Sequence, residues 1–209
     1  MPMMSKLSSS SSIATKLAAM TVVGAICMAL VAATILLIAR SQLITERTEK
    51  AHAIVDAVWQ VADTFQKEAA AGKMTDEEAR KRFFAVSSAV WYEDHTNYVF
   101  IYDYDTGITV SNPGIPHLLG KDMREMKDAF GLPFAAMLID IAKKGQGSLR
   151  YSFLRSSTDP TPLDKVAFAR GFAPWHLMIG TAEYMSDVDA SFWSMAKTAS
   201  AVIAALMLL

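Results

Sequence analysis

The chain has 209 residues, with 20 lysines and arginines against 21 aspartates and glutamates, which gives a formal net charge of −1. This length accommodates one folded domain of about 150 residues together with further segments. The lack of a basic surplus argues against a nucleic-acid partner. The single cysteine, Cys27, excludes a disulfide framework and a cysteine-based metal site within the chain.

An uncharged apolar run extends from Leu17 to Ala39, between Lys16 and Arg40. A hydrocarbon core about 30 Å thick needs about 20 helical residues, so this run predicts a transmembrane helix over residues 17–39. A cleaved signal peptide is the alternative, but its apolar core is only about 7–15 residues long. Residues 1–16, which include a serine run, are expected to form a disordered tail.

A second apolar run, Thr198–Leu209, ends the sequence. A helix of this length rises only about 18 Å, which is too short to cross a bilayer. We therefore expect residues 191–209 to be the start of a second transmembrane helix, truncated here, with Phe192 and Trp193 in the interfacial aromatic belt. The alternative is a short terminal helix buried in protein.

Small and apolar residues at heptad spacing follow the first span and predict that its helix continues beyond the membrane. This heptad stripe consists of Ala51, Val55, Val58, Ala62, Phe65 and Ala69. It is interpreted as a dimer seam, as a face packed on the chain's own domain, or as each of these along different parts of the helix. Gly72 is expected to cap this helix, and Thr75 and Glu78 to form a capping box that begins a second helix.

The stretch 98–113 predicts two strands joined by a turn. Aromatic and aliphatic side chains alternate in the first strand, so Tyr98, Phe100 and Tyr102 share one face. Asp105-Thr106-Gly107 supplies the turn, because glycine tolerates a positive φ. The aromatic face is interpreted either as ordinary core or as the floor of a binding pocket.

A further helix is expected to begin at Gly131–Pro133 and to end at Lys143–Gly145. Three more strands are expected at Ser148–Arg155, Asp164–Phe172 and Trp175–Glu183. The order of elements predicts an α+β fold with a long N-terminal helix and a five-stranded antiparallel sheet with covering helices. This domain is assigned to residues 40–190.

Several short pieces occur in a set order and spacing: Asn97–Asp103, Gly107, Asn112-Pro113, Leu118–Asp122, Asp128–Gly131, Phe134, Gly145–Gly147, Tyr151, Lys165, Phe172, Pro174-Trp175 and Ile179–Thr181. Together they resemble a single Cache sensor domain, a PAS-like extracytoplasmic module of bacterial chemoreceptors and sensor kinases. The resemblance covers residues 41–190. Two positions depart from the family pattern: Asn112 stands where histidine is frequent, and Trp91 stands where an arginine that contacts acidic ligands is common.

The resemblance implies a ligand site between one face of the sheet and the helix and loop that cover it. The ligand-binding residues that it implies are Trp91, Tyr98, Phe100, Tyr102, Asp128, Tyr151 and Lys165. Lys165 would suit a carboxylate and Asp128 an amine, and a small organic acid is favoured. The alternative is that the aromatic residues are plain core and that Lys165 lies on the surface.

The sequence contains no pattern typical of an enzyme. His52, His95, His117 and His176 lack the spacing of metal ligands, and there is no glycine-rich phosphate loop. We therefore expect a protein without catalytic activity, metal or cofactor.

The resemblance implies a homodimeric methyl-accepting chemotaxis receptor of the bacterial inner membrane, with a periplasmic sensor domain and a downstream signalling module absent from this chain. The positive charges do not decide the orientation, because Lys6 and Lys16 lie on one side of the span and Arg40, Arg47 and Lys50 on the other. The resemblance to an external sensor implies that residues 1–16 are a cytoplasmic tail. The alternatives are the input domain of a sensor histidine kinase or cyclase, and a dimerisation or docking module that binds no ligand.

Overall fold

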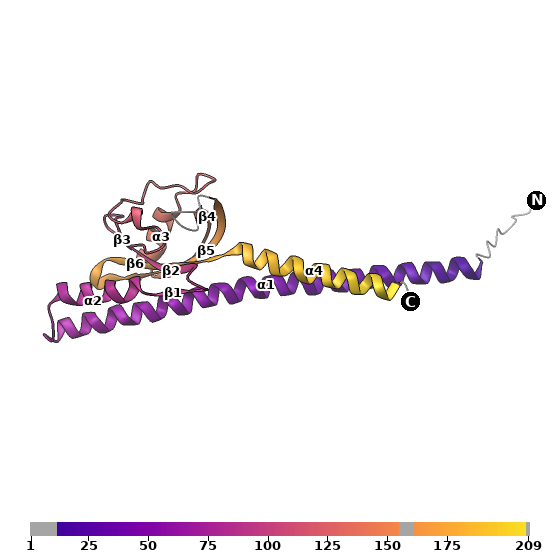
Figure 1. The fold of residues 1–209 in the computed structure, drawn as a ribbon, viewed down its shortest axis with the longest axis horizontal. Helices are drawn as coiled ribbons and strands as arrows, with labels where there is room; N and C mark the ends of the chain where they lie inside the picture. Colours follow the sequence, from indigo (N-terminus) through magenta and orange to yellow (C-terminus); the bar gives the residue numbers. More distant parts are fainter. Residues whose placement is uncertain (1–11, 155–160, 208–209) are drawn as a thin grey trace, which may run out of the picture. The chain divides into compact units, whose positions relative to one another are not determined.

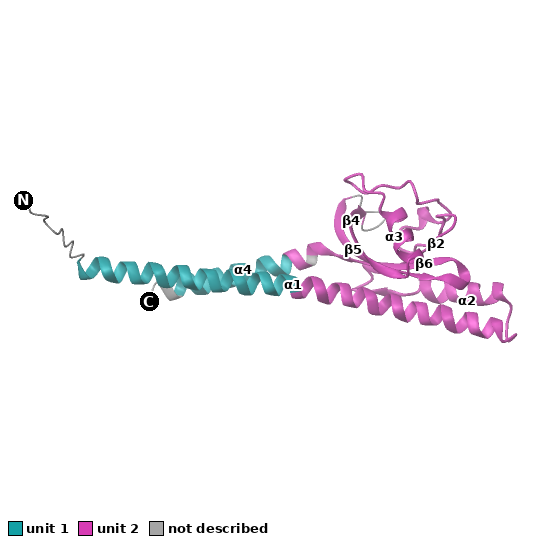
Figure 2. Cartoon of the chain, turned by 180° about the vertical axis from the view of Figure 1, so that it is seen from behind, with its two compact units in different colours: residues 1–41, 190–209 teal, residues 42–189 magenta. Residues whose placement is uncertain are grey.

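The structure, a computed structural model, describes residues 12–154 and 161–207 and contains two compact units (Figure 1). Unit 1 comprises residues 1–41 and 190–209, and unit 2 comprises residues 42–189 (Figure 2). Two long helices contribute residues to both units: α1 (Ile13–Ala70) and α4 (Met185–Met207).

Unit 1 contains the predicted membrane segments. Large apolar side chains of α1 are exposed there, among them Leu17, Leu30 and Leu37. Among the described residues, α1 is the one helix that is long and apolar enough to cross a membrane. The second predicted span, residues 191–209, lies mainly in α4, with its last two residues outside the described part of the chain. Its role as a span stays a prediction.

Within the described residues, unit 2 contains one antiparallel sheet with helices on both faces (Figure 1). The strands are β1 (Trp91–Tyr92), β2 (Asn97–Asp103), β3 (Thr109–Ser111), β4 (Gln146–Leu154), β5 (Pro162–Phe172) and β6 (Leu177–Tyr184). Their order is β1-β2-β6-β5-β4, and β3 pairs with β2. The α+β prediction is confirmed. The sheet has a sixth strand, β1, whose two residues are too few for a period-two pattern.

The remaining described elements of unit 2 are α2 (Asp76–Ser88), α3 (Phe134–Lys143) and 3-10 turns at Pro116–Leu118 and Ala173–Trp175. The predicted helix cap at Gly72 and the predicted turn at Gly107 are confirmed, because these glycines have positive φ values of 74° and 76°. The Thr75 hydroxyl accepts a hydrogen bond from the Glu78 amide (3.1 Å) and so caps α2. The Glu78 carboxylate accepts from Arg82 (2.6 Å), so only the Thr75 half of the expected capping box forms.

One face of the sheet packs against α1 and α2. Ala51, Val55, Val58 and Ala62 of α1 are buried in the core on this face, together with Val99, Ile101, Phe168, Phe172 and Ile179 of the sheet. Phe65 and Ala69 are half-buried against the same core. The heptad stripe therefore packs on the chain's own domain, which confirms this interpretation, and the dimer seam stays a prediction.

The opposite face of the sheet packs against α3. Tyr98, Phe100 and Tyr102 belong to this second core, whereas Val99 and Ile101 of the same strand belong to the first. The predicted alternation along β2 is thus confirmed. Figure 1 shows α1 and α3 on opposite sides of the sheet, so β2 separates the two cores.

Candidate ligand pocket

A cavity lies between the sheet and the elements that cover its α3 face. Its lining comes from β2, β4, β5, β6, α3 and the segment after β3: Asn97, Tyr98, Phe100, Tyr102, Asn112, Ile115, Phe134, Tyr151, Phe153, Lys165, Ala182 and Tyr184. Its volume, for the centres of water molecules, is about 20 Å³. That is room for roughly one water molecule. A larger ligand therefore requires the cover to move.

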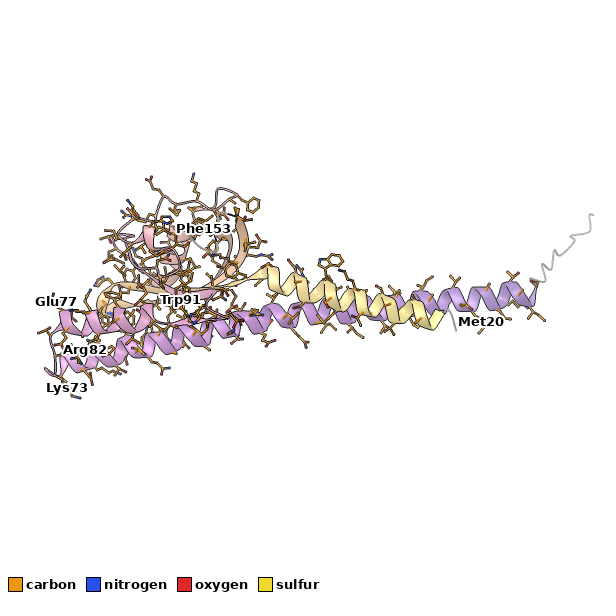
Figure 3. The ribbon with its side chains drawn as sticks, viewed as in Figure 1. Met20, Lys73, Glu77, Arg82, Trp91 and Phe153 are labelled. Carbon is orange, nitrogen blue, oxygen red and sulfur yellow. The ribbon has the colours of Figure 1, made fainter. Side chains whose placement is uncertain are left out.

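Aromatic rings form much of the cavity wall. Phe134 of α3 stacks on Tyr151 of β4, with ring centroids 4.5 Å apart, and lies 4.7 Å from the ring of Phe153. Figure 3 labels Phe153 on the side of the sheet where α3 lies. On β2, the rings of Phe100 and Tyr102 are 5.5 Å apart. These rings form the apolar part of the cavity wall, and polar side chains form about as much of it. Small-molecule sites usually combine apolar walls with a few polar groups.

Lys165 is the only charged side chain among the described residues that line the cavity. It is 4% exposed, so the alternative of a surface position is wrong. Its position on β5 places it beside Tyr151 of β4 and Tyr184 of β6 in the strand register. The ammonium donates to the carbonyl oxygen of Leu154 and lies 4.7 Å from the centre of the Tyr184 ring. The cavity wall therefore carries a buried positive charge, which attracts an anion more strongly than an exposed one would.

Four tyrosines line the cavity together with this cation: Tyr98, Tyr102, Tyr151 and Tyr184. Burial raises the pKa of Tyr98, Tyr102 and Tyr151 above the ordinary range for tyrosine. Each of these three hydroxyls therefore stays protonated at neutral pH and is able to donate a hydrogen bond. The cavity combines one positive charge with several neutral donors.

The segment after β3 closes one edge of the cavity. Asn112 Oδ1 accepts a hydrogen bond from the Ile115 amide (3.0 Å), which fixes the turn. A Cβ atom at Gly114 would lie 1.8 Å from Cε1 of Tyr98, so only glycine fits there. The backbone at Gly114 therefore lies directly against the ring of a lining residue.

Five of the seven predicted ligand-binding residues line the cavity: Tyr98, Phe100, Tyr102, Tyr151 and Lys165. Trp91 does not line it, although its ring packs 5.3 Å from that of Tyr98. The lining also includes residues outside the predicted set, such as Asn97, Asn112 and Tyr184. The alternation of side chains along β6 places Ala182 and Tyr184 on the same face, and this pattern could have predicted that they line the cavity together.

Asp128 does not line this cavity, and its carboxylate accepts hydrogen bonds from backbone amides. Its Oδ1 accepts from the amides of Phe130 (2.8 Å) and Leu132 (2.9 Å), and its Oδ2 accepts from the amide of Ser152 (3.1 Å). Burial opposes ionisation of this carboxyl, but the backbone donors outweigh it and lower the pKa of Asp128. Its contacts tie the segment before α3 to β4.

The fold and its covered cavity are those of a sensor domain. The family profile described as Single Cache domain 2 matches residues 43–198, and the chain belongs to this family. The predicted resemblance is confirmed.

Curated relatives carry the same domain in signalling proteins. The chain is 32% identical to the sensor histidine kinase MctS of Rhizobium johnstonii over 115 residues, 55% of this chain and 24% of that protein. It is 27% identical to the methyl-accepting chemotaxis protein McpP of Pseudomonas putida over 164 residues, 78% of this chain and 30% of that protein. The matched region thus spans less than a third of either relative.

A solved structure of a Cache chemosensory domain that recognises carboxylic acids has the same fold. It matches with a TM-score of 0.63 at 24% identity, over 69% of this chain and 97% of that one. The chain therefore carries a Cache sensor domain of the kind found in chemotaxis receptors and sensor histidine kinases.

Proposed function

We propose that this chain is the sensory part of an inner-membrane chemoreceptor, and that its Cache domain binds a small organic acid in the cavity. The observation that supports this proposal most directly is the buried Lys165 ammonium in the cavity wall. The carboxylic-acid recognition of the structurally similar Cache domain agrees with it, as does the chemotaxis role in the name of McpP.

The chemistry of the lining suits a short monocarboxylate. A ligand carboxylate would accept a charge-assisted hydrogen bond from Lys165 and neutral hydrogen bonds from the tyrosine hydroxyls. The small volume and the rings of Phe134 and Phe153 would exclude long or highly charged acids. Binding would displace α3 and the segment at Asn112, since these form the cover.

The proposed receptor would place the N-terminus in the cytoplasm and unit 2 in the periplasm, with an output module beyond this sequence. A ligand acts only through its different affinity for two arrangements of the protein. Because Ala182 and Tyr184 of β6 line the cavity and α4 begins directly after β6, we propose that signals leave through α4. We also propose a homodimer, whose two chains would contact one another through surfaces other than the buried residues of the heptad stripe.

Calorimetry on the full chain in lipid nanodiscs tests the binding function. Acetate and propionate are titrated at neutral pH, with propylammonium as the oppositely charged control. The expected result is binding of a carboxylate and no heat from the amine. Lys165→Met is expected to weaken carboxylate binding at least about tenfold, because a hydrogen bond to a charged group contributes roughly 1.5–3 kcal/mol.

The matched control is Lys81→Met, which removes a lysine from the exposed part of α2. It is expected to bind like the wild type. Both variants are first checked by circular dichroism for the wild-type unfolding transition. Binding of neither acid, or equal affinity in a folded Lys165→Met variant, would overturn the proposal. The former result favours the docking-module alternative.

A further inference from the structure

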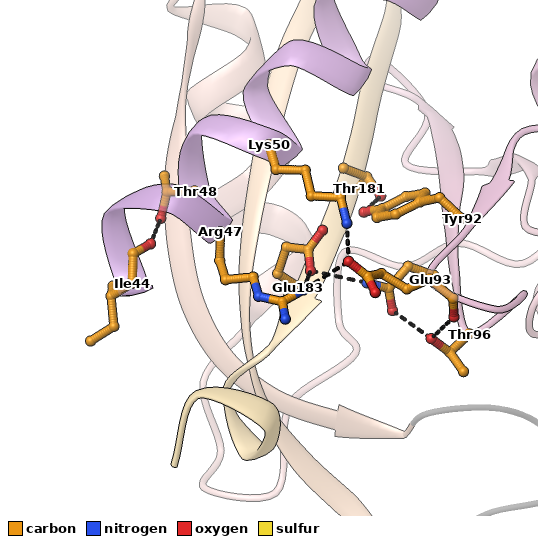
Figure 4. A network of polar contacts seen from close by, with 10 residues as sticks. Ile44, Arg47, Thr48, Lys50, Tyr92, Glu93, Thr96, Thr181 and Glu183 are labelled. Carbon is orange, nitrogen blue, oxygen red and sulfur yellow. Dashed lines mark hydrogen bonds and ion pairs between the residues drawn. The ribbon is translucent and has the colours of Figure 1, made fainter. Parts of the chain in front are cut away.

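Glu183 is a buried carboxylate on the strand that forms part of the cavity wall. Its neighbours on β6, Ala182 and Tyr184, line the cavity. Since side chains alternate along a strand, Glu183 points to the opposite face, towards α1. Figure 4 shows Arg47 and Lys50 of α1 reaching to this point. Glu183 is only 1% exposed.

The two carboxylate oxygens of Glu183 have different surroundings. Oε2 accepts from Asn97 Nδ2 (3.1 Å) and lies 3.4 Å from Arg47 Nη1. Oε1 is buried and has no hydrogen-bond partner among the residues that the structure describes. An ionised carboxylate with one buried, unsatisfied oxygen is unfavourable, and protonation would relieve this cost.

A second carboxylate competes for the same cations. Glu93 Oε1 accepts from Arg47 Nη1 at 2.9 Å and also from Lys50 Nζ (Figure 4). The side chain of Glu93 is 36% exposed, so its charge is solvated as well as paired. Arg47 is therefore closer to Glu93 than to Glu183, and the buried carboxylate is the less stabilised of the two.

The charged and polar groups around Glu183 also favour its protonated form. Burial raises the pKa of Glu183, and the charge of Glu93 raises this pKa further. Lys50, Tyr92 and Arg47 lower it, but burial outweighs them. Asn97 from β2 is neutral, and β5 presents the apolar Val166 beside Glu183 in the ladder. The hydrogen bond from Lys50 lowers the pKa of Glu93, despite burial.

The loop that carries Glu93 is strained. Glu93, Asp94 and His95 have φ values of 49°, 52° and 60°, the left-handed region that costs non-glycine residues energy. Such a conformation persists only where surrounding contacts hold it, and it is common at switch regions. The ion pairs from α1 to Glu93 are contacts that hold this loop.

We propose that Glu183 is a proton-binding site and that its protonation switches the contact between α1 and β6, so that the domain responds to pH. With Glu183 ionised, Arg47 is shared by two carboxylates and ties α1 to β6. When Glu183 accepts a proton, the attraction to Arg47 is lost and Arg47 pairs with Glu93 alone. Beside this contact, Met185 and Val188 at the start of α4 pack near Leu43 and Ile44 of α1.

The proton site and the proposed ligand site share one residue of β2. Asn97 lines the cavity and donates to Glu183, so occupancy of the cavity and proton binding are expected to influence one another reciprocally. This link alone rests on the proposed function. The proton site itself is tested without any small molecule, so its failure and that of ligand binding are distinguishable.

The test is a pH titration by NMR of the full chain in nanodiscs, following the side-chain carboxyl carbon of Glu183 and the Nε resonance of Arg47. Glu183→Gln assigns the carboxyl signal and mimics the protonated form. We expect Glu183 to titrate at higher pH than Glu49, an exposed glutamate on α1. We expect the Arg47 resonance to shift with the same midpoint, and to lose this transition in Glu183→Gln.

The matched control, Glu49→Gln, is expected to keep the Arg47 transition. Two results would overturn the proposal. The first is a Glu183 midpoint at or below that of Glu49. The second is an Arg47 resonance whose transition is the same in wild type and Glu183→Gln.

Discussion

The rings of Phe134 and Tyr151 are stacked with their planes 2° apart and their centroids 4.5 Å apart. This contact joins α3, the cover of the cavity, to β4. Both side chains are buried, Phe134 at 1% and Tyr151 at 6% exposure. The cavity is therefore closed by the same packing that forms the core on this face, so binding and stability depend on shared residues.

Replacing Phe134 with alanine should destabilise unit 2 by about 3–5 kcal/mol, because it leaves a cavity where a buried ring stood. Chemical denaturation of the full chain, followed by near-ultraviolet circular dichroism, measures the change. The control is Phe130→Ala, which removes a ring that is 84% exposed. It should alter stability by less than about 0.5 kcal/mol. Equal effects would contradict the packing described here.

Gly114→Ala should destabilise the domain by about 1–3 kcal/mol, since its Cβ would overlap the ring of Tyr98. The three nearest atoms to this Cβ all belong to the Tyr98 ring, so Tyr98→Ala should relieve most of the overlap. In a double-mutant cycle, the alanine at 114 should therefore cost much less in the Tyr98→Ala background. Additive effects of the two substitutions would show that the close approach is absent.

Ala51→Leu tests whether the heptad stripe belongs to the chain's own core. Ala51 is fully buried, so the larger side chain should cost about 1–3 kcal/mol of unfolding free energy. Ala57→Leu, on the exposed side of α1, should be nearly neutral. Neither substitution should change the mass of the particle in light scattering. A changed mass with unchanged stability in Ala51→Leu would instead indicate a dimer seam.

Asp128→Asn should lower stability at neutral pH by removing the ionised acceptor of the backbone amides. The pKa of Asp128 is lowered in the folded state, so its stabilisation is present above the ordinary pKa of aspartate, about 3.9. That stabilisation is lost as the pH falls through the folded-state pKa. The difference between variant and wild type should therefore shrink in acid. Unfolding midpoints measured between pH 3 and 7 check this, and a constant difference would contradict it.

The sequence was sufficient to predict those features that depend on local periodicity. Tyr98, Phe100 and Tyr102 were placed on one face because side chains alternate along a strand, and the pattern is visible in seven consecutive residues of β2. The turn at Gly107 is also predictable from local sequence, because it depends only on a positive φ that glycine tolerates. The α+β order of elements followed from such signals.

Features that depend on pairing between distant segments could not be predicted. Glu183 and Arg47 are 136 positions apart, and only the packing of α1 against β6 brings them together. The strand pattern alone does not predict the burial of Lys165, because a lysine in a strand usually faces solvent; only the family resemblance indicates its place in the site. Asp128 accepts hydrogen bonds from three backbone amides, a role that a loop sequence does not reveal, and its contact with a ligand stays a prediction.

The most direct test of the proposed function is the position of a bound carboxylate. Nuclear Overhauser effects from the methyl group of ¹³C-labelled acetate or propionate to aromatic protons should be measured in the full chain. The account predicts contacts to the rings of Phe134 and Tyr151, and their loss in Lys165→Met. Binding with contacts only to the exposed ring of Phe130, or with none to the cavity, would contradict it.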